Sequence, residues 1–184
     1  MKHRLYIRNI LISMLVLSAF SCSSDLDFDQ ANDLTVQPVF TTNLAYLEAK
    51  ASNFVINGSE QPLFSYISSV DFFSSSFVEN DLVKTDLYFR IKNTITRAYA
   101  LDITFLDKNN APIYTIPTMN VAASTGAEEL FETTETFTPA NVSVLKNTTK
   151  MIFSIKMLPG PPLTATSLGR IEFSSSITAY FDVK

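Results

Sequence analysis

Few side chains in this sequence could do chemistry, and they gather near its start. The only cysteine, Cys22, follows the uncharged run Ile10–Phe20, and aspartates come after it at the alternate positions Asp25, Asp27 and Asp29. A thiol can act as a nucleophile, a metal ligand or a point of modification, and alternate carboxylates can converge on a calcium ion. Which of these chemistries applies decides most of what the sequence says about function.

The aspartates match only the beginning of a calcium-binding loop. Such a loop needs glycine at its sixth position and a bidentate acid at its twelfth, and the chain has Gln30 and Val36 there. The sequence therefore argues against a metal site, and we expect no cofactor of any kind.

Catalytic chemistry is equally hard to place in the rest of the chain. The only histidine, His3, lies in the segment that we expect to be cleaved off, so no imidazole would remain to activate a serine or the thiol. Paired carboxylates of the glycosidase type remain, but the chain has no tryptophan to form a sugar platform. We expect that the protein is not an enzyme.

The first twenty-one residues have the order of a secretory signal peptide. Lys2, Arg4 and Arg8 form a basic head, an uncharged apolar run follows, and small residues end it. The run is too short for a spanning helix, which needs about 20 apolar residues. We predict that residues 1–21 are removed, so that Cys22 becomes the first residue.

The junction at Cys22 resembles a bacterial lipoprotein signal. In that family the cysteine thiol is alkylated with diacylglycerol, the bond before it is cut, and the new amino terminus is often acylated. Ser21 fits the family pattern, whereas Ala19 and Phe20 depart from its leucine and small residue. The resemblance implies that Cys22 is the lipid attachment site. The alternative is ordinary secretion, with cleavage near Ser18–Ser21 and a free thiol.

The residues after Cys22 resemble the short Ser- and Asp-rich signals that direct Bacteroidota-type lipoproteins to the outer face of the outer membrane. Those that carry the resemblance are Ser23, Ser24, Asp25, Asp27, Phe28 and Asp29. The alternative is a solvated tether, which at about 3.3 Å per residue could hold the domain roughly 35 Å from the bilayer. The expected location is the outer membrane of a Gram-negative bacterium, facing outward.

The charge of the mature chain limits its partners. Removing three basic residues with the leader leaves eleven Lys and Arg against eighteen Asp and Glu, a formal net charge of −7. Nucleic-acid binding needs basic side chains to replace counterions, so it is not expected. Anionic head groups would also repel the chain, so we expect membrane attachment through covalent lipid.

Alternating apolar and polar residues dominate the chain from about residue 34, which predicts strands. Strands are expected at 34–41, 44–55, 63–77, 83–91, 99–105, 113–116, 151–157 and 171–183. Those at 83–91, 99–105 and 113–116 are expected to form a meander. Thr138-Pro139 has the order of a helix start, with Val142 and Leu145 three apart, so one short helix is expected there.

These elements predict an all-β fold, an antiparallel β-sandwich of immunoglobulin-like type with seven to nine strands and one short helix. A closed barrel is the alternative. The expected organisation is a lipoprotein signal peptide at 1–21, an acidic lipidated tether at 22–33 and a single β-sandwich domain at 34–184.

Two functions fit this organisation. The first is a non-enzymatic binding or accessory module with an unknown protein or glycan partner, and the second is a structural or assembly subunit of an outer-membrane complex. An aromatic cleft would favour a ligand, and a flat apolar patch would favour a permanent partner. The acidic run at Glu128, Glu129, Glu132 and Glu135 is interpreted as a solvated strand or loop face.

Overall fold

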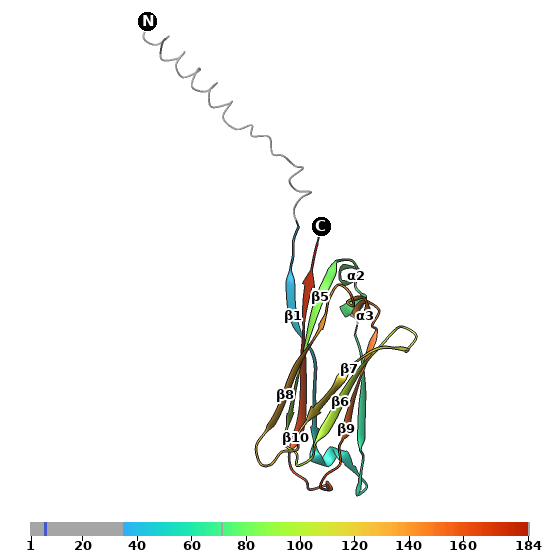
Figure 1. Cartoon of the computed structure of the whole chain (residues 1–184), viewed down its shortest axis with the longest axis vertical. Helices are drawn as coiled ribbons and strands as arrows, with labels where there is room; N and C mark the ends of the chain where they lie inside the picture. The colour runs from blue at the N-terminus through green and yellow to red at the C-terminus, as the bar shows by residue number, and fades with distance from the viewer. Residues whose placement is uncertain (1–5, 7–34, 71, 184) are drawn as a thin grey trace. The chain divides into compact units, whose positions relative to one another are not determined.

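Two four-stranded antiparallel sheets, packed face to face, form the folded part of the protein (Figure 1). The computed structural model describes Tyr6, residues 35–70 and residues 72–183, and residues 35–183 make up one compact unit. Apart from Tyr6, the predicted signal peptide lies outside the described residues, as do Cys22 and the Ser- and Asp-rich strip.

The two sheets are built from eight long strands, and a small hairpin lies beside them. In chain order the strands are β1 Val39–Lys50, β2 Val55–Ile56, β3 Ser59–Glu60, β4 Leu63–Ser69, β5 Leu82–Asn93, β6 Tyr99–Leu106, β7 Pro112–Val121, β8 Glu129–Phe137, β9 Lys150–Met157 and β10 Arg170–Phe181. The helices are η2 Ala51–Phe54, η3 Phe72–Ser74, α2 Ser76–Asp81 and α3 Ser143–Lys146.

The order of the strands is that of a jelly roll. One sheet has the order β1-β10-β5-β8 and the other has the order β4-β9-β6-β7. Among the eight long strands the first pairs with the last, the second with the seventh, the third with the sixth and the fourth with the fifth. This is the pattern of one long hairpin rolled into two layers, the double-sheet architecture of jelly rolls.

The predicted antiparallel β-sandwich is confirmed, but its strand order differs from the immunoglobulin type. Immunoglobulin domains keep their first two strands side by side in one sheet. Here β1 and β4 lie in different sheets. The barrel that the sequence also allowed is not formed, because β1 and β4 at one side, and β7 and β8 at the other, are not paired with each other.

Inward-facing residues at alternate positions make up the core, as the alternation predicted. On β5 the alternate residues Thr85, Leu87, Phe89, Ile91 and Asn93 are buried, as is Leu82 at its start, and β6, β9 and β10 show similar alternation. The ring of Phe173 on β10 lies 6.1 Å from that of Phe89 and 5.5 Å from that of Phe153 on β9. Aromatic side chains from both sheets therefore fill the centre of the sandwich.

Several predicted boundaries were wrong. The strands predicted at 34–41 and 44–55 are one strand, β1, with an irregularity between Asn43 and Ala45. The strand predicted at 63–77 ends at Ser69, and two short helices follow it. Ser75 begins the second of these helices, α2, because its hydroxyl accepts a hydrogen bond from the backbone N–H of Val78.

The predicted meander was also wrong, because its first strand belongs to the other sheet. The chain leaves β5 at Asn93, whose buried side chain donates to the carbonyls of Arg97 and Ala122 and accepts from the N–H of Ile95. These bonds direct the chain across the sandwich, so β6 pairs with β7 and β9 instead of β5.

The predicted short helix exists but begins later than Pro139, at Ser143, and its Leu145 and the preceding Val142 are buried. The expectation of a single short helix was wrong, because α2, η2 and η3 are present as well.

Candidate functional site

The acidic run begins just before the edge strand β8 and continues along it, and two of its four glutamates are paired with basic residues. Glu128 lies 3.0 Å from Lys92, and Glu132 lies 3.3 Å from Arg90, with the basic side chains coming from β5. Within the part of the chain that the structure describes, no group of three or more histidine, cysteine or acidic side chains could hold a metal ion.

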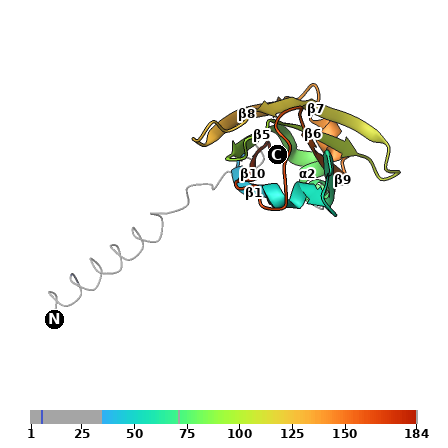
Figure 2. The ribbon, with the colours of Figure 1, turned by 90° about the horizontal axis from the view of Figure 1, so that it is seen from below.

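Glu135 differs from the rest of the acidic run because it faces the other sheet. Its carboxylate accepts a hydrogen bond from the hydroxyl of Tyr114 on β7, and this bond raises the pKa of Tyr114 to about 12. The Tyr114 ring also packs edge-on against Phe137, 5.2 Å away. The end-on view shows β7 and β8 side by side (Figure 2). This side of the sandwich is closed.

The opposite side, between the edge strands β1 and β4, is open; we call it the open side. On β4, Phe64 and Tyr66 pair with Ile155 and Phe153 of β9, whose side chains are buried. Phe64 and Tyr66 therefore point toward the inner face, yet they are 45% and 47% exposed. Core-facing aromatic residues with this exposure lack a covering layer.

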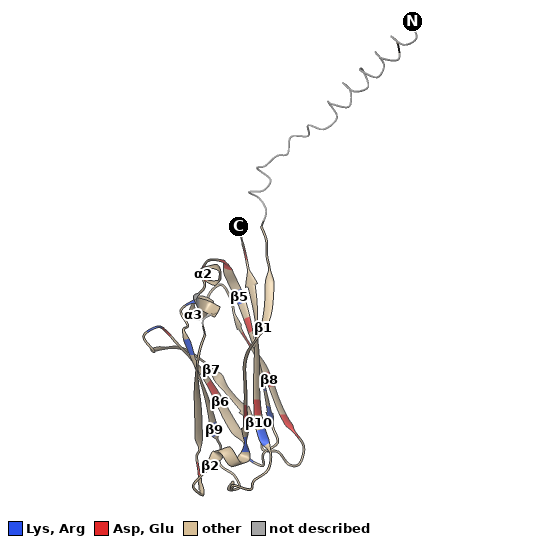
Figure 3. Cartoon of the chain, turned by 180° about the vertical axis from the view of Figure 1, so that it is seen from behind, with Lys and Arg blue, Asp and Glu red and all other residues tan. Residues whose placement is uncertain are grey.

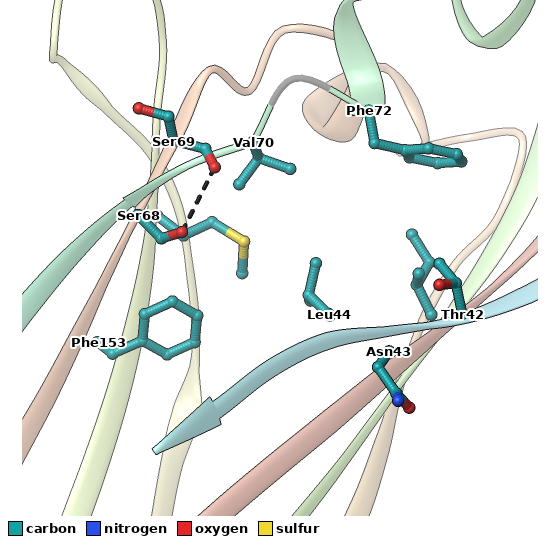
Figure 4. A pocket seen from close by; sticks show the side chains of 10 residues that line it. Thr42, Asn43, Leu44, Ser68, Ser69, Val70, Phe72 and Phe153 are labelled. Atoms are coloured by element: carbon teal, nitrogen blue, oxygen red, sulfur yellow. Dashed lines mark hydrogen bonds between the residues drawn. The ribbon is translucent and has the colours of Figure 1, made fainter.

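A cavity of about 210 Å³ lies in the open side (Figure 4). Leu44 of β1, Val70 after β4 and Phe72 of η3 line it, and side chains from β9 and β10 also contribute. Small-molecule sites usually measure about 300–1,000 Å³. This cavity is closer to the size of one inserted side chain than to that of a whole ligand.

Strand β4 also exposes apolar residues on its outer face. Leu63 is 58% exposed and Ile67 is 59% exposed. Adding Phe64 and Tyr66 gives four large side chains on a seven-residue strand that contains no charge. Single exposed apolar residues are ordinary, whereas a contiguous group on one edge indicates a contact surface.

Two other places in the described chain bring charged side chains together. A cavity of about 420 Å³ near α3 is lined by residues that include Asp107, Lys108 and Lys146, and it has no aromatic wall. At the end of the sandwich that carries the β2–β3 hairpin, Arg97 lies 3.1 Å from Glu60 and donates to two backbone carbonyls, while Glu60 also accepts from the N–H of Leu163. These bonds join three loops and leave no open position for a substrate.

The sequence predicted the acidic run as a solvated strand or loop face, but it did not single out β4. The lack of any charge from Leu63 to Val70 is visible in the sequence. It could have indicated an edge strand with a contact role, because exposed edges normally carry charges or prolines.

No helix among the described residues is long and apolar enough to cross a membrane.

Comparisons with known proteins yield only distant likenesses. No protein-family model and no curated protein matches the chain. Among solved structures, it is similar to a Parabacteroides distasonis protein described as secreted, with 15% identity, 64% of this chain and 38% of that chain covered, and a TM-score of 0.45.

It is also similar to a chain of infectious bursal disease virus strain Gx, with 9% identity, 80% of this chain and 37% of that chain covered, and a TM-score of 0.42. A Desmodium yellow mottle tymovirus chain is 11% identical, with 82% of this chain and 89% of that chain covered and a TM-score of 0.36. This chain thus spans less than two fifths of the first two proteins. Likenesses this distant say nothing about what the protein does.

Proposed function

We propose that the mature protein is a lipid-anchored envelope protein that acts without catalysis, as a binding or accessory module. Cys22 is the lipid attachment site, and the strip of Ser23, Ser24, Asp25, Asp27, Phe28 and Asp29 directs the protein to the outer face of the outer membrane. The observation that carries the binding role is the open side, where core-facing Phe64 and Tyr66 are half exposed beside an apolar cavity.

The distribution of charge supports contact through this side of the molecule. The strands of the β1-β10-β5-β8 sheet carry eleven charged residues, whereas those of the β4-β9-β6-β7 sheet carry three. In Figure 3 the red and blue segments, which mark the charged residues, are more frequent on β5, β8 and β10 than on β6, β7 and β9. Protein interfaces are depleted of charge at their centres, so the sheet that contains β4 is the better contact face.

A partner protein is favoured over a small ligand or glycan. The apolar residues of β4 form a row along an edge, and the adjoining cavity holds about one side chain. A permanent contact of this kind also fits the alternative role, a structural or assembly subunit of an outer-membrane complex.

The anchor is tested by changing Cys22 to alanine in the full-length protein. We expect loss of labelled palmitate incorporation and release of the protein from the membrane fraction, because two or three acyl chains hold a protein effectively irreversibly. Ser21→Cys in the Cys22→Ala background is the matched control for position. Unchanged labelling of Cys22→Ala would contradict the anchor.

The contact surface is tested by placing a photo-crosslinking amino acid at Phe64 in cells that express the full-length protein. The matched position is Thr115, which is exposed on the edge strand β7. We expect one discrete protein adduct from position 64 and none from position 115. Equal adducts from both positions, or none from either, would argue against a contact on the open side.

A further inference from the structure

Three of the four edge strands carry features that prevent strand pairing with another molecule. β1 has an irregularity at Asn43–Ala45 and ends with Glu48 and Lys50. β7 contains Pro112 and Pro117. Bulges, charges and prolines on edges are the usual protection against edge-to-edge association.

The third protected edge strand is β8, which carries glutamates on both of its faces. Glu132 faces solvent, and Glu135 points inward to Tyr114. Inward-pointing charges also protect an edge. The protein therefore blocks pairing at β1, β7 and β8.

Strand β4 has none of these features. Residues Leu63–Ser69 include no charge and no proline, and their pairing with β9 runs without a register shift. The edge is long, regular and apolar, which is the type that pairs with another strand. An unprotected edge in a protein that protects the other three indicates an interface.

The backbone of β4 has its free groups at fixed positions. The carbonyl of Pro62 accepts from the N–H of Met157 on β9, and the N–H of Val70 donates to the carbonyl of Thr149, the residue just before β9. Since these groups alternate in direction along a strand, the N–H and C=O of the odd-numbered residues between them point to the free edge. These residues are Leu63, Ser65, Ile67 and Ser69, and their eight groups face outward for a further strand. The carbonyl of Ser69 already accepts a 3.4 Å hydrogen bond from the Ser68 hydroxyl, and its second lone pair remains for a partner.

A second copy of β4 fits this edge in one register. When two copies run antiparallel about a two-fold axis at Tyr66, Leu63 faces Ser69, Ser65 faces Ile67, and all eight free groups of each copy meet a partner. Phe64 then faces Ser68. In this register every large side chain except Tyr66 lies opposite a serine, so the two strands can approach without a steric clash.

Charge and area are consistent with this pairing. Two copies of an acidic chain would repel each other through most surfaces, but β4 brings no charge to the contact. Four apolar side chains per copy, each about half exposed, offer roughly 800 Å² for the pair before the backbone is counted. That area is at the low end for specific interfaces, so the association should be reversible.

We infer that the partner of β4 is a second copy of this chain, bound by antiparallel β4–β4 pairing centred on Tyr66. The two β4-β9-β6-β7 sheets become one continuous eight-stranded sheet, and the two open sides face each other. This inference rests on the proposed function, because it names the partner of the same surface.

The test uses Tyr66→Cys in the full-length protein, analysed on non-reducing gels after purification from membranes. The Cα atoms of a residue pair at the two-fold centre lie about 4.5 Å apart when the pair is not hydrogen-bonded, which a disulfide can span. We expect a reducible band at twice the mass of the chain. The unsubstituted protein is the control for any bond made by Cys22.

Ser68→Cys is the matched control on the same face of β4. Its twin in the second copy lies four residues along the strand, about 13 Å away, so no disulfide is expected. The double variant Phe64→Cys/Ser68→Cys should link, because these positions face each other. Equal linkage of Tyr66→Cys and Ser68→Cys, or no dimer from Tyr66→Cys, would overturn the inference.

A non-covalent measurement tests the same pairing without the cysteine variants, in case these variants do not fold. Ile67→Lys changes an exposed residue and should weaken self-association of the detergent-solubilised protein by about tenfold or more, measured by sedimentation. If the unsubstituted protein is monomeric at all concentrations while position 64 still crosslinks to a different protein, the second copy is excluded and the proposed function survives.

Discussion

At the scale of single residues, the most constrained charge in the described chain is Arg97. Only 9% of its side chain is exposed, and its guanidinium is neutralised by Glu60 and held by the carbonyls of Leu158 and Pro161. A Cβ on Gly160 would come within 2.9 Å of this side chain. The cluster therefore fixes the β2–β3 hairpin and the β9–β10 loop against the strand that begins at Tyr99.

Replacing Glu60 with glutamine should destabilise the fold by about 2–3 kcal/mol, because the buried Arg97 charge loses its counter-charge but keeps two carbonyl acceptors. Urea unfolding of the full-length protein measures the change. Glu132→Gln is the matched control, since the side chains of Arg90 and Glu132 are 41% and 45% exposed and solvent-accessible pairs contribute little. Similar losses in both variants would contradict the role given to Arg97.

At the scale of elements, the sequence predicted the faces of the strands better than their partners. Side chains alternate along a strand, so the buried faces of β5 and β10 follow directly from residue type. The partner of a strand depends on where the chain goes after it. The turn after β5 crosses between the sheets through bonds of the Asn93 side chain, and the sequence gives no sign of this.

The limits of β4 illustrate a second reason for error. Phe72, Phe73 and Phe77 continue the apolar pattern past Ser69, so the strand was expected to continue. The Ser75 cap begins a helix instead. The apolar pattern alone allows either a longer strand or a helix, and the local cap decides for the helix.

The candidate site was the least predictable part, for a physical reason. Phe64 and Tyr66 have the residue types and spacing of core positions, and a pattern-based prediction would bury them. They are exposed because β4 is an edge strand and β1 does not cover it, which is a property of the assembled sheets. By contrast, Cys22 and the strip after it remain predictions that rest on the sequence alone.

At the scale of the whole molecule, the two sheets differ in the surfaces they present. One sheet is covered with paired charges, and the other combines a largely uncharged outer face with the apolar edge of β4 (Figure 3). The side closed by Tyr114 and Glu135 lies opposite the open side. This asymmetry directs contacts to a single edge.

Hydrogen exchange of the β4 backbone amides measures directly whether the open side is a contact surface. Exchange of residues 63–69 is compared between the protein in native membranes and the same protein at high dilution in detergent. We expect slow exchange in membranes and fast exchange on dilution, because the N–H groups of Leu63, Ser65, Ile67 and Ser69 lose their partners. Equally fast exchange in both conditions would contradict it.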